Sequence, residues 1–302
     1  MPIPDYQSFF LPVLRALSDD LAYSSADLRG KLIATLGLSP EQLHEKLPSG
    51  RQSVFANRVA WSTFYLAKAG ALRRPKRGTS LITERGHKLL QEHPNGFTVR
   101  TLTQFPEFVA FYKPTGSTPD SKAEVQTDSS ETPEEQLANA YQVLREALAN
   151  DVLEAVRKSP PAFMETLVVD LLVAMGYGGS VADAGRAVGQ SGDGGVDGVI
   201  KEDKLGLDLV YIQAKRWKES IGRPLVQGFA GSLEGFRARK GVFITTSTFT
   251  AEARAYVQNI EKKIVLIDGK ELADLMIEHN VGVAVTRTIT LKRLDSDYFE
   301  AD

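Results

Sequence analysis

The sequence predicts an α/β protein with two domains: an amino-terminal helical domain, and a carboxyl-terminal domain with a mixed sheet and flanking helices. Helical periodicity dominates residues 1–96 and ends in a basic hairpin pattern. After residue 160, short apolar runs instead alternate with amphipathic stretches. The 302 residues are enough for two separate cores. We therefore divide the chain into residues 1–96, a connecting segment at 97–135, and residues 136–302.

Three helices are predicted in the amino-terminal domain, because apolar residues recur at helical spacing over 6–17, 25–36 and 52–69. The segment at 39–50 has room for one more helical turn. Two short strands, starting at Leu72 and Ser80, flank a tip at 75–78, and a helix over 84–92 closes the domain.

Three helices followed by a basic hairpin are typical of a winged helix, in which the third helix enters the DNA major groove and the hairpin follows phosphates. Residues 1–96 hold 13 Lys+Arg against 8 Asp+Glu, which agrees with DNA binding. Winged helices also dock proteins, so that alternative remains open. For phosphates we expect Arg73, Arg74, Lys76 and Arg77, and for base edges Arg51, Asn57 and Arg58.

Composition excludes several classes of site. The whole chain has a net charge of -2, which hides the basic front end. Cysteine is absent, which excludes disulfides, Cys-zinc sites and thiol catalysis. The 4 histidines are scattered, so a His-metal nuclease or a Ser-His-Asp hydrolase is poorly supported. No export signal or membrane span is visible, and we expect a cytoplasmic protein.

The connecting segment has two parts. Residues 97–112 are too aromatic for a free linker and are expected to pack on a domain or a partner. Residues 113–135 are rich in Pro, Ser, Thr and acids, which is typical of a flexible linker. Its acidity could cover a basic surface when DNA is absent, although a plain spacer is the simpler interpretation.

Helices and strands alternate in the carboxyl-terminal domain. An antiparallel hairpin at 196–200 and 209–215, followed by helix-linked strands, predicts the mixed sheet. The run 245–248 could bind phosphate or cap the next helix, and the cap is the commoner outcome. The further helices are expected at 134–158, 162–175, 224–239, 250–259 and 270–278, and the further strands near Val181, at 241–246, at 264–267 and, weakly, at 283–291.

The hairpin also carries the candidate chemistry. Gln213 and Lys215 share one face of the second strand, and Asp197 on the first strand can lie beside them. Carboxylate and amide oxygens suit Mg²⁺, which lowers the pKa of a bound water, and an ammonium can orient that water and stabilise a phosphate. Phosphodiester hydrolysis is the reaction that this set favours.

These residues resemble a known nuclease family. Asp197, a spacer of 15 residues and Gln213-Ala214-Lys215 resemble the PD-(D/E)xK core in its D-QxK variant. GDGGVDG, YIQAKRW and GVFITTSTFTAEA resemble the Mrr-type (type IV) restriction endonucleases, and NRVAWSTFYLAKAGALRRPKRGTSLITERG resembles their amino-terminal domain. The resemblance implies a restriction-endonuclease-like α/β/α core, Mg²⁺ dependence, and cleavage of double-stranded DNA that carries methylated adenine or cytosine.

One departure from the wider nuclease pattern matters. The usual acid two residues before the lysine is Gln213, so the metal site loses one negative charge. The resemblance places a functional glutamate at Glu165, which would join Asp197 and Gln213 as a metal ligand. Asp193 is a less certain second acid.

Two other functions stay open on the sequence alone: a DNA-binding regulator with an inactive nuclease core, and a structure-selective repair nuclease. A double-strand break needs two active sites, so we expect a homodimer or higher oligomer on DNA.

Overall fold

The computed structural model describes residues 2–48, 50, 52–112, 130–178, 195–203, 205–292 and 294. It divides the chain into two compact units, one of Met1–Val143 with Arg293–Asp302 and one of Leu144–Lys292. The boundary falls inside the 26-residue helix α8 (Pro133–Lys158). In the described part of the chain, no helix combines the length and apolar character that crossing a membrane requires.

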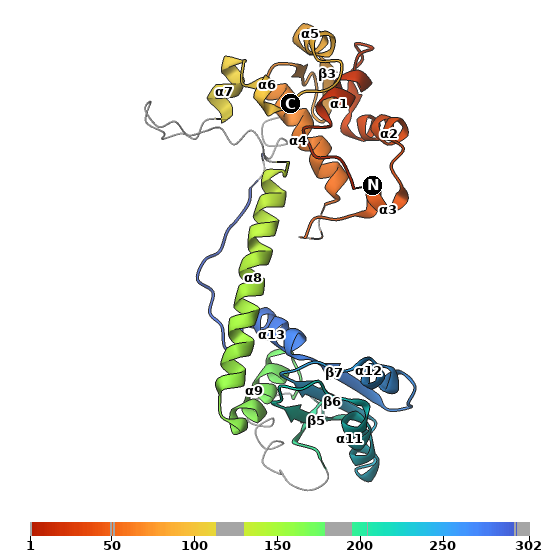
Figure 1. Ribbon diagram of the computed structural model, residues 1–302, viewed down its shortest axis with the longest axis vertical. Helices are drawn as coiled ribbons and strands as arrows, with labels where there is room; N and C mark the ends of the chain where they lie inside the picture. Colours follow the sequence, from red (N-terminus) through yellow and green to blue (C-terminus); the bar gives the residue numbers. More distant parts are fainter. Residues whose placement is uncertain are drawn as a thin grey trace. The chain divides into compact units, whose positions relative to one another are not determined.

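The first unit contains the predicted winged-helix arrangement (Figure 1). Its three-stranded antiparallel sheet has the order β1-β3-β2, and β2 and β3 form the hairpin. The elements are α1 (Phe10–Ala16), β1 (Tyr23–Ser24), α2 (Ser25–Leu36), α3 (Pro40–His44), α4 (Val54–Lys68), β2 (Leu72–Arg73), β3 (Thr79–Ile82) and α5 (Glu84–Glu92).

Hydroxyl side chains start the helices of this unit. Ser24, Ser53 and Thr83 are the N-caps of α2, α4 and α5, and each accepts a hydrogen bond from a backbone N–H of the first turn. Gly37 ends α2 in the left-handed conformation, which glycine adopts at little cost. Asp5 caps this segment as predicted, but residues 6–9 form turns with hydrogen bonds three residues apart, such as Phe9 N–H to the Tyr6 carbonyl at 3.3 Å, so that α1 begins at Phe10.

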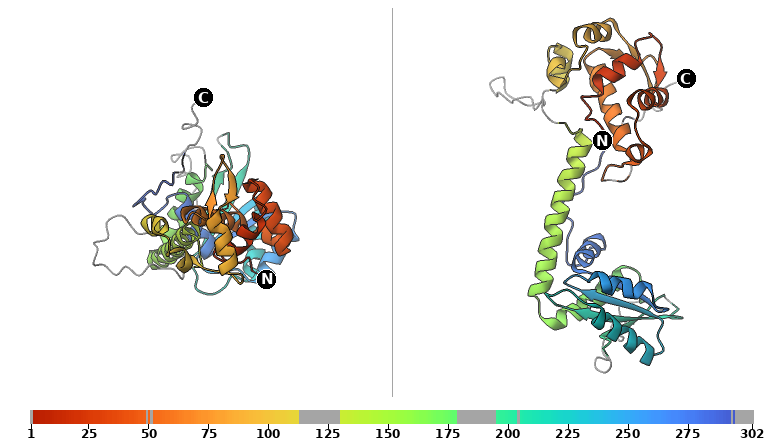
Figure 2. Two further views of the ribbon diagram at one scale, coloured as in Figure 1. Left: turned by 90° about the horizontal axis from the view of Figure 1, so that it is seen from above. Right: turned by 45° about the vertical axis from the view of Figure 1, so that its right-hand side comes forward.

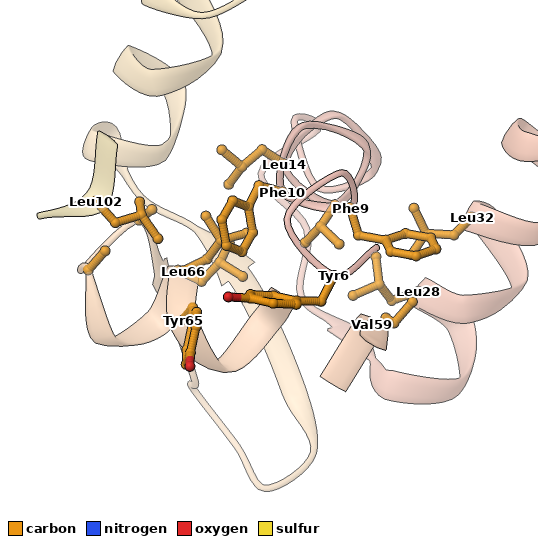
Figure 3. Packing of buried hydrophobic residues seen from close by; sticks show 14 of the residues in the cluster. Tyr6, Phe9, Phe10, Leu14, Leu28, Leu32, Val59, Tyr65, Leu66 and Leu102 are labelled. Atoms are coloured by element: carbon orange, nitrogen blue, oxygen red, sulfur yellow. The ribbon is translucent and has the colours of Figure 1, made fainter. Parts of the chain in front are cut away.

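The aromatic segment packs on this unit. It forms α6 (Val99–Leu102) and α7 (Pro106–Tyr112), and Val99, Leu102 and Phe108 are buried in the same core as α1 and α4. Figure 3 shows Leu102 together with Leu66 and Phe10 in this core. Burial raises the pKa of the Tyr6 and Tyr65 phenols, because the charged form would lose its hydration.

The second unit has a four-stranded mixed sheet of order β4-β5-β6-β7, as predicted. β4 runs antiparallel to β5, whereas β5, β6 and β7 are parallel. After α8, its elements are α9 (Pro161–Ala174), β4 (Gly198–Lys201), β5 (Leu209–Lys215), α11 (Arg223–Gly235), β6 (Lys240–Thr245), α12 (Ala251–Gln258), β7 (Lys263–Ile267) and α13 (Gly269–Glu278).

Each face of this sheet has its own core, which gives an α/β/α sandwich (Figure 2). One face packs against α8, α9 and α13 through residues such as Leu171 and Ile212. The other face packs against α11 and α12, with Phe229 and Phe243 in edge-to-face contact. Successive residues of β5 therefore point alternately to the α9 side and to the α11 side.

The tail differs from its prediction. Residues 283–292 form no strand, and Val285 and Ile289 are 73% and 63% exposed. Weak alternation does not make a strand when neither face of the segment is buried. The predicted strand near Val181, the acid Asp193 and residues 113–129 of the linker lie outside the described residues.

Candidate functional site

Asp197 continues the ladder between β4 and β5. Its N–H donates to the Ile212 carbonyl at 2.8 Å, and its Oδ2 accepts the Ala214 N–H at 2.7 Å. The carboxylate therefore takes the place that a backbone carbonyl would have in the sheet, which fixes its orientation. Within the described residues, no second group donates to this carboxylate, so its other oxygen is available to a ligand.

Glu165 meets Asp197 at a small cavity. Glu165 is half-buried on α9, and it lines with Asp197 and Ala214 a cavity of about 10 Å³, enclosed by apolar side chains such as Val168. That volume is close to the minimum that holds one water molecule. The two carboxylates that line this space are oxygen donors of the kind that a hard cation prefers. No cluster of three or more His, Cys, Asp or Glu occurs among the residues described.

Gln213 lies on the other side of β5. It is 6% exposed and shares its face with Tyr211, which packs in the α11 core. Its Nε2 is 3.6 Å from the position that a Cβ on Gly195 would take, and Ser232 Oγ of α11 is 3.1 Å from the same position. The structure therefore brings Glu165 and Asp197 together at the α9 side, and it places the Gln213 amide toward α11.

Lys215 ends β5 on the same face as Gln213, with an intermediate exposure. In the described regions its ammonium has no acidic partner. Its backbone is held firmly, because its carbonyl accepts from Thr245 Oγ1 at 2.9 Å and from the Thr246 N–H at 3.2 Å. A free cation on a fixed backbone at the end of a strand is well suited to meet a phosphate.

The hydroxyl run 245–248 does not cap the next helix, which was the favoured prediction, and phosphate binding by it stays a prediction. Thr246 donates to the carbonyl of Trp217 and Ser247 to that of Lys218, both at 2.9 Å, and α12 is capped by Thr250. These side chains fasten residues 215–218 to the end of β6. The sequence showed only that a polar run follows a buried strand. The carbonyl groups of Trp217 and Lys218, to which the run donates, could be identified only from the structure.

Two arginines that the sequence did not single out support the same region. Arg157 donates to the Thr246 carbonyl at 2.6 Å and 3.2 Å. Arg216 donates to the carbonyls of Arg157, at 3.1 Å, and of Ser159. Both guanidinium groups therefore join the end of α8 to the ends of β5 and β6, next to Lys215.

The β2–β3 hairpin presents its cations to solvent. Arg73, Arg74, Lys76 and Arg77 are all exposed. Thr79 closes the tip, because its Oγ1 donates to the Lys76 carbonyl at 2.8 Å and accepts the Lys76 N–H at 3.1 Å. This geometry is suited to phosphate contacts, which stay a prediction for these residues.

The polar residues of α4 are engaged within the protein. Asn57 is 2% exposed and accepts from Thr132 Oγ1 at 2.6 Å. Arg58 donates its Nε to Glu135 at 2.9 Å and one terminal nitrogen to the carbonyl of Ile3 at 2.6 Å. The prediction that Asn57 and Arg58 meet base edges does not agree with these contacts, because partners far away in the sequence occupy both side chains. Arg51 lies outside the described residues.

Comparisons with known proteins agree with this organisation. Residues 156–276 match a family model described as a restriction endonuclease (Mrr_cat), and residues 6–92 match one described as the Mrr N-terminal domain. The chain is 40% identical over 309 residues to the type IV methyl-directed restriction enzyme EcoKMrr of Escherichia coli (strain K12), covering 99% of this chain and 100% of that protein. The MspJI restriction endonuclease, solved in complex with a 27-mer oligonucleotide, aligns with 68% of this chain and 49% of its own at 18% identity, and its TM-score of 0.30 is too low to support an argument.

Proposed function

The chain belongs to the Mrr family of restriction endonucleases, and from this premise we propose that it cleaves double-stranded DNA containing methylated adenine or cytosine, and so restricts foreign DNA. The observation that carries the proposal is the similarity over the full chain to a relative named as methyl-directed. We assign DNA binding to residues 1–96, the connection to 97–135 and cleavage to 136–302. Its place of action is the cytoplasm, where incoming DNA would be met.

The metal in this proposal is Mg²⁺. The carboxylates of Asp197 and Glu165 would hold it, because both line one cavity with room for about one water molecule. Gln213 is the proposed third ligand, and its amide would have to reach across β5 from the α11 side. When bound, the ion would lower the pKa of a water and neutralise charge on the phosphate.

The residues of the chain supply the remaining chemistry. Ala214 N–H holds the Asp197 carboxylate in one orientation. Lys215, whose ammonium has no acidic partner in the described regions, orients the attacking water and stabilises the negative charge that grows on the phosphate. The hydroxyls of Thr245 and Thr246 keep the backbone of residues 215–217 in place while that charge develops.

A second candidate function is a DNA-binding regulator with an inactive core. The observation in its favour is the position of Gln213, a neutral residue on the face away from Glu165. A structure-selective repair nuclease is a third alternative, which would ignore methylation and prefer branched DNA.

Plasmid cleavage separates these functions. Purified protein with Mg²⁺ is expected to cut a plasmid that carries adenine or cytosine methylation and to leave the unmethylated plasmid intact, and chelation with EDTA should stop cutting. Lys215→Ala should slow cleavage by about 10²–10³-fold, because one charged group that stabilises a transition state contributes roughly that factor. Lys270→Ala, at a side chain that is 82% exposed on α13, is the matched control and should cut like the wild type.

The outcomes are distinct. DNA binding without cleavage of any plasmid would support the regulator, and cleavage that ignores methylation but favours junctions would support the repair nuclease. Equal cutting by Lys215→Ala and the wild type would remove Lys215 from the proposed mechanism.

A further inference from the structure

The first unit contains a cavity of about 180 Å³ between α2, α4 and the β2–β3 hairpin. Leu28 and Val59, which are buried, and Ala60 on α4 supply apolar surface to it. A cavity of about 150 Å³ is known to admit benzene, whereas drug-sized ligands need about 300 Å³ or more. The volume therefore suits one planar ring system and little else.

Ser80 gives the cavity a polar group that the protein does not use. It is 8% exposed, and in the described part of the unit its hydroxyl has no hydrogen-bond partner. The other hydroxyls at the cavity are occupied, because Ser25 Oγ donates to the Gly78 carbonyl at 3.1 Å, Thr63 Oγ1 to the Ala60 carbonyl at 2.9 Å and Thr79 Oγ1 to the Lys76 carbonyl at 2.8 Å. No buried side-chain oxygen or nitrogen among the described residues lacks a partner, so the Ser80 hydroxyl is reached by solvent and is free to hydrogen-bond the polar edge of a ligand in the cavity.

Two cations complete the lining. Arg29 on α2 and Arg74 at the hairpin both line the cavity, and no acidic partner for either occurs among the described residues. Unpaired guanidinium groups beside a ring-sized cavity with one apolar wall suit a ligand that combines a flat ring with an anion, which is the chemistry of one nucleotide.

We propose that this cavity receives the methylated base of the DNA target, turned out of the double helix. The methyl group lies against Leu28, Val59 and Ala60, the polar edge of the base meets Ser80, and Arg29 and Arg74 hold the flanking phosphate. This inference rests on the proposed function, and it assigns recognition of the methyl group to this cavity of the first unit. Enzymes that act on or inspect single bases commonly extrude them into pockets of this kind, at a cost in stacking that snug contacts offset.

The first experiment compares Ala60→Leu with Ala26→Leu. Both substitutions add the same side chain at an exposed helical position, but only Ala60 lines the cavity. The probe is a DNA fragment of about 200 base pairs, amplified with normal nucleotides, with 5-methyl-dCTP or with N6-methyl-dATP, so that every sequence context carries the methyl group. The measured quantity is the ratio of the dissociation constants for unmethylated and methylated fragments.

Burial of one methyl group contributes roughly fourfold to that ratio. We expect at least this ratio for the wild type and for Ala26→Leu, and a ratio close to one for Ala60→Leu, with circular dichroism confirming that both variants fold. If Ala60→Leu weakens both fragments and leaves the ratio unchanged, the cavity is only a phosphate contact and the proposal fails while the proposed function stands. If the wild type shows no preference for either methylated fragment, the cavity does not read the methyl group and this inference fails, while methyl-dependent cutting of the plasmid still decides the proposed function.

A second measurement on the wild type needs no variant. The base left opposite an extruded one becomes reactive, at thymine toward permanganate and at guanine toward kethoxal. The complex with the methylated fragment should show such reactivity, and the complex with the unmethylated fragment should not. A methylated complex that is bound tightly yet shows only paired bases would overturn extrusion into the cavity.

Discussion

Arg58 and Glu135 form an enclosed ion pair, with side-chain exposures of 18% and 7%. The Glu135 carboxylate accepts from Arg58 and, at 2.8 Å, from the Thr132 N–H, and Trp61 donates its indole N–H to the adjacent Glu134. These contacts fix the start of α8 on α4. At the scale of single residues, the polar side chains of α4 therefore connect this helix to the start of α8 within the first unit.

Glu135→Gln is therefore expected to lower the free energy of unfolding of the first unit by about 1–3 kcal/mol, because it removes the charge from a buried pair and leaves Arg58 without a counterion. The measurement is urea unfolding followed by the fluorescence of Trp61. The control is Glu92→Gln, which removes an exposed ion pair between Glu92 Oε1 and Lys88 Nζ at 3.7 Å. It should change the free energy of unfolding by less than about 0.5 kcal/mol. Equal effects of the two variants would show that the Arg58 pair contributes no more than a surface pair.

At the scale of elements, α5 approaches the preceding strands too closely for a side chain. A Cβ on Gly86 would meet the Ala71 carbonyl oxygen and lie 2.6 Å from Ile82 Cγ1. This contact seats α5 on the β2–β3 hairpin, so the glycine is required by packing. Gly30, in the middle of α2, has open space around it instead.

Alanine at these two positions should have opposite effects. Gly86→Ala is expected to lower the free energy of unfolding by about 1–3 kcal/mol, since the backbone of residue 71 must shift. Gly30→Ala should raise it by about 0.5–1 kcal/mol, because alanine loses less conformational entropy in a helix. The difference in stability between each variant and the wild type can be measured by thermal unfolding. Stabilisation by Gly86→Ala would contradict the close packing of α5.

At the scale of the whole molecule, the described residues of each chain bring Asp197 and Glu165 to one cavity and place Lys215 at the end of β5, and we propose that these residues form one active site. One such set cuts one strand at a time, so a double-strand break requires two chains. We infer that the active form on DNA is a homodimer or a higher oligomer.

Mixing experiments test this assembly. If wild-type and Lys215→Ala chains are mixed equally and exchange, only about a quarter of random dimers hold two active chains. Linear plasmid should then fall to about that fraction, and nicked circles should accumulate. The control is the same mixture with Lys270→Ala, which should give linear plasmid throughout. A monomer that cuts twice would instead lose about half of its linear product and form few nicked circles.

The sequence by itself determined the elements with local signals. The residues of α2, α5 and β5 match the predicted ranges, because caps, stop glycines and strand alternation are set by neighbours in the chain. The sequence motifs around Asp197 and Lys215 are also short and continuous in the chain. They were enough to suggest the family, and the resemblance to that family in turn suggested Glu165. The mixed character of the sheet was predicted from the hairpin and the helix-linked strands, whereas the order of its strands is seen only in the structure.

Only the tertiary structure decided what side chains far apart in the sequence do to one another. Arg58 pairs with Glu135, which lies 77 residues later in the chain, and the pattern of residues in α4 does not predict that partner. Gln213 and Asp197 are neighbours across the hairpin, yet packing on two different cores separates Gln213 from Glu165. The cavity at Ser80 likewise arises where α2, α4 and the hairpin meet. Interactions between neighbouring residues determine helices and strands. Binding sites form where helices and strands pack against one another, and those surfaces come together only when the chain folds.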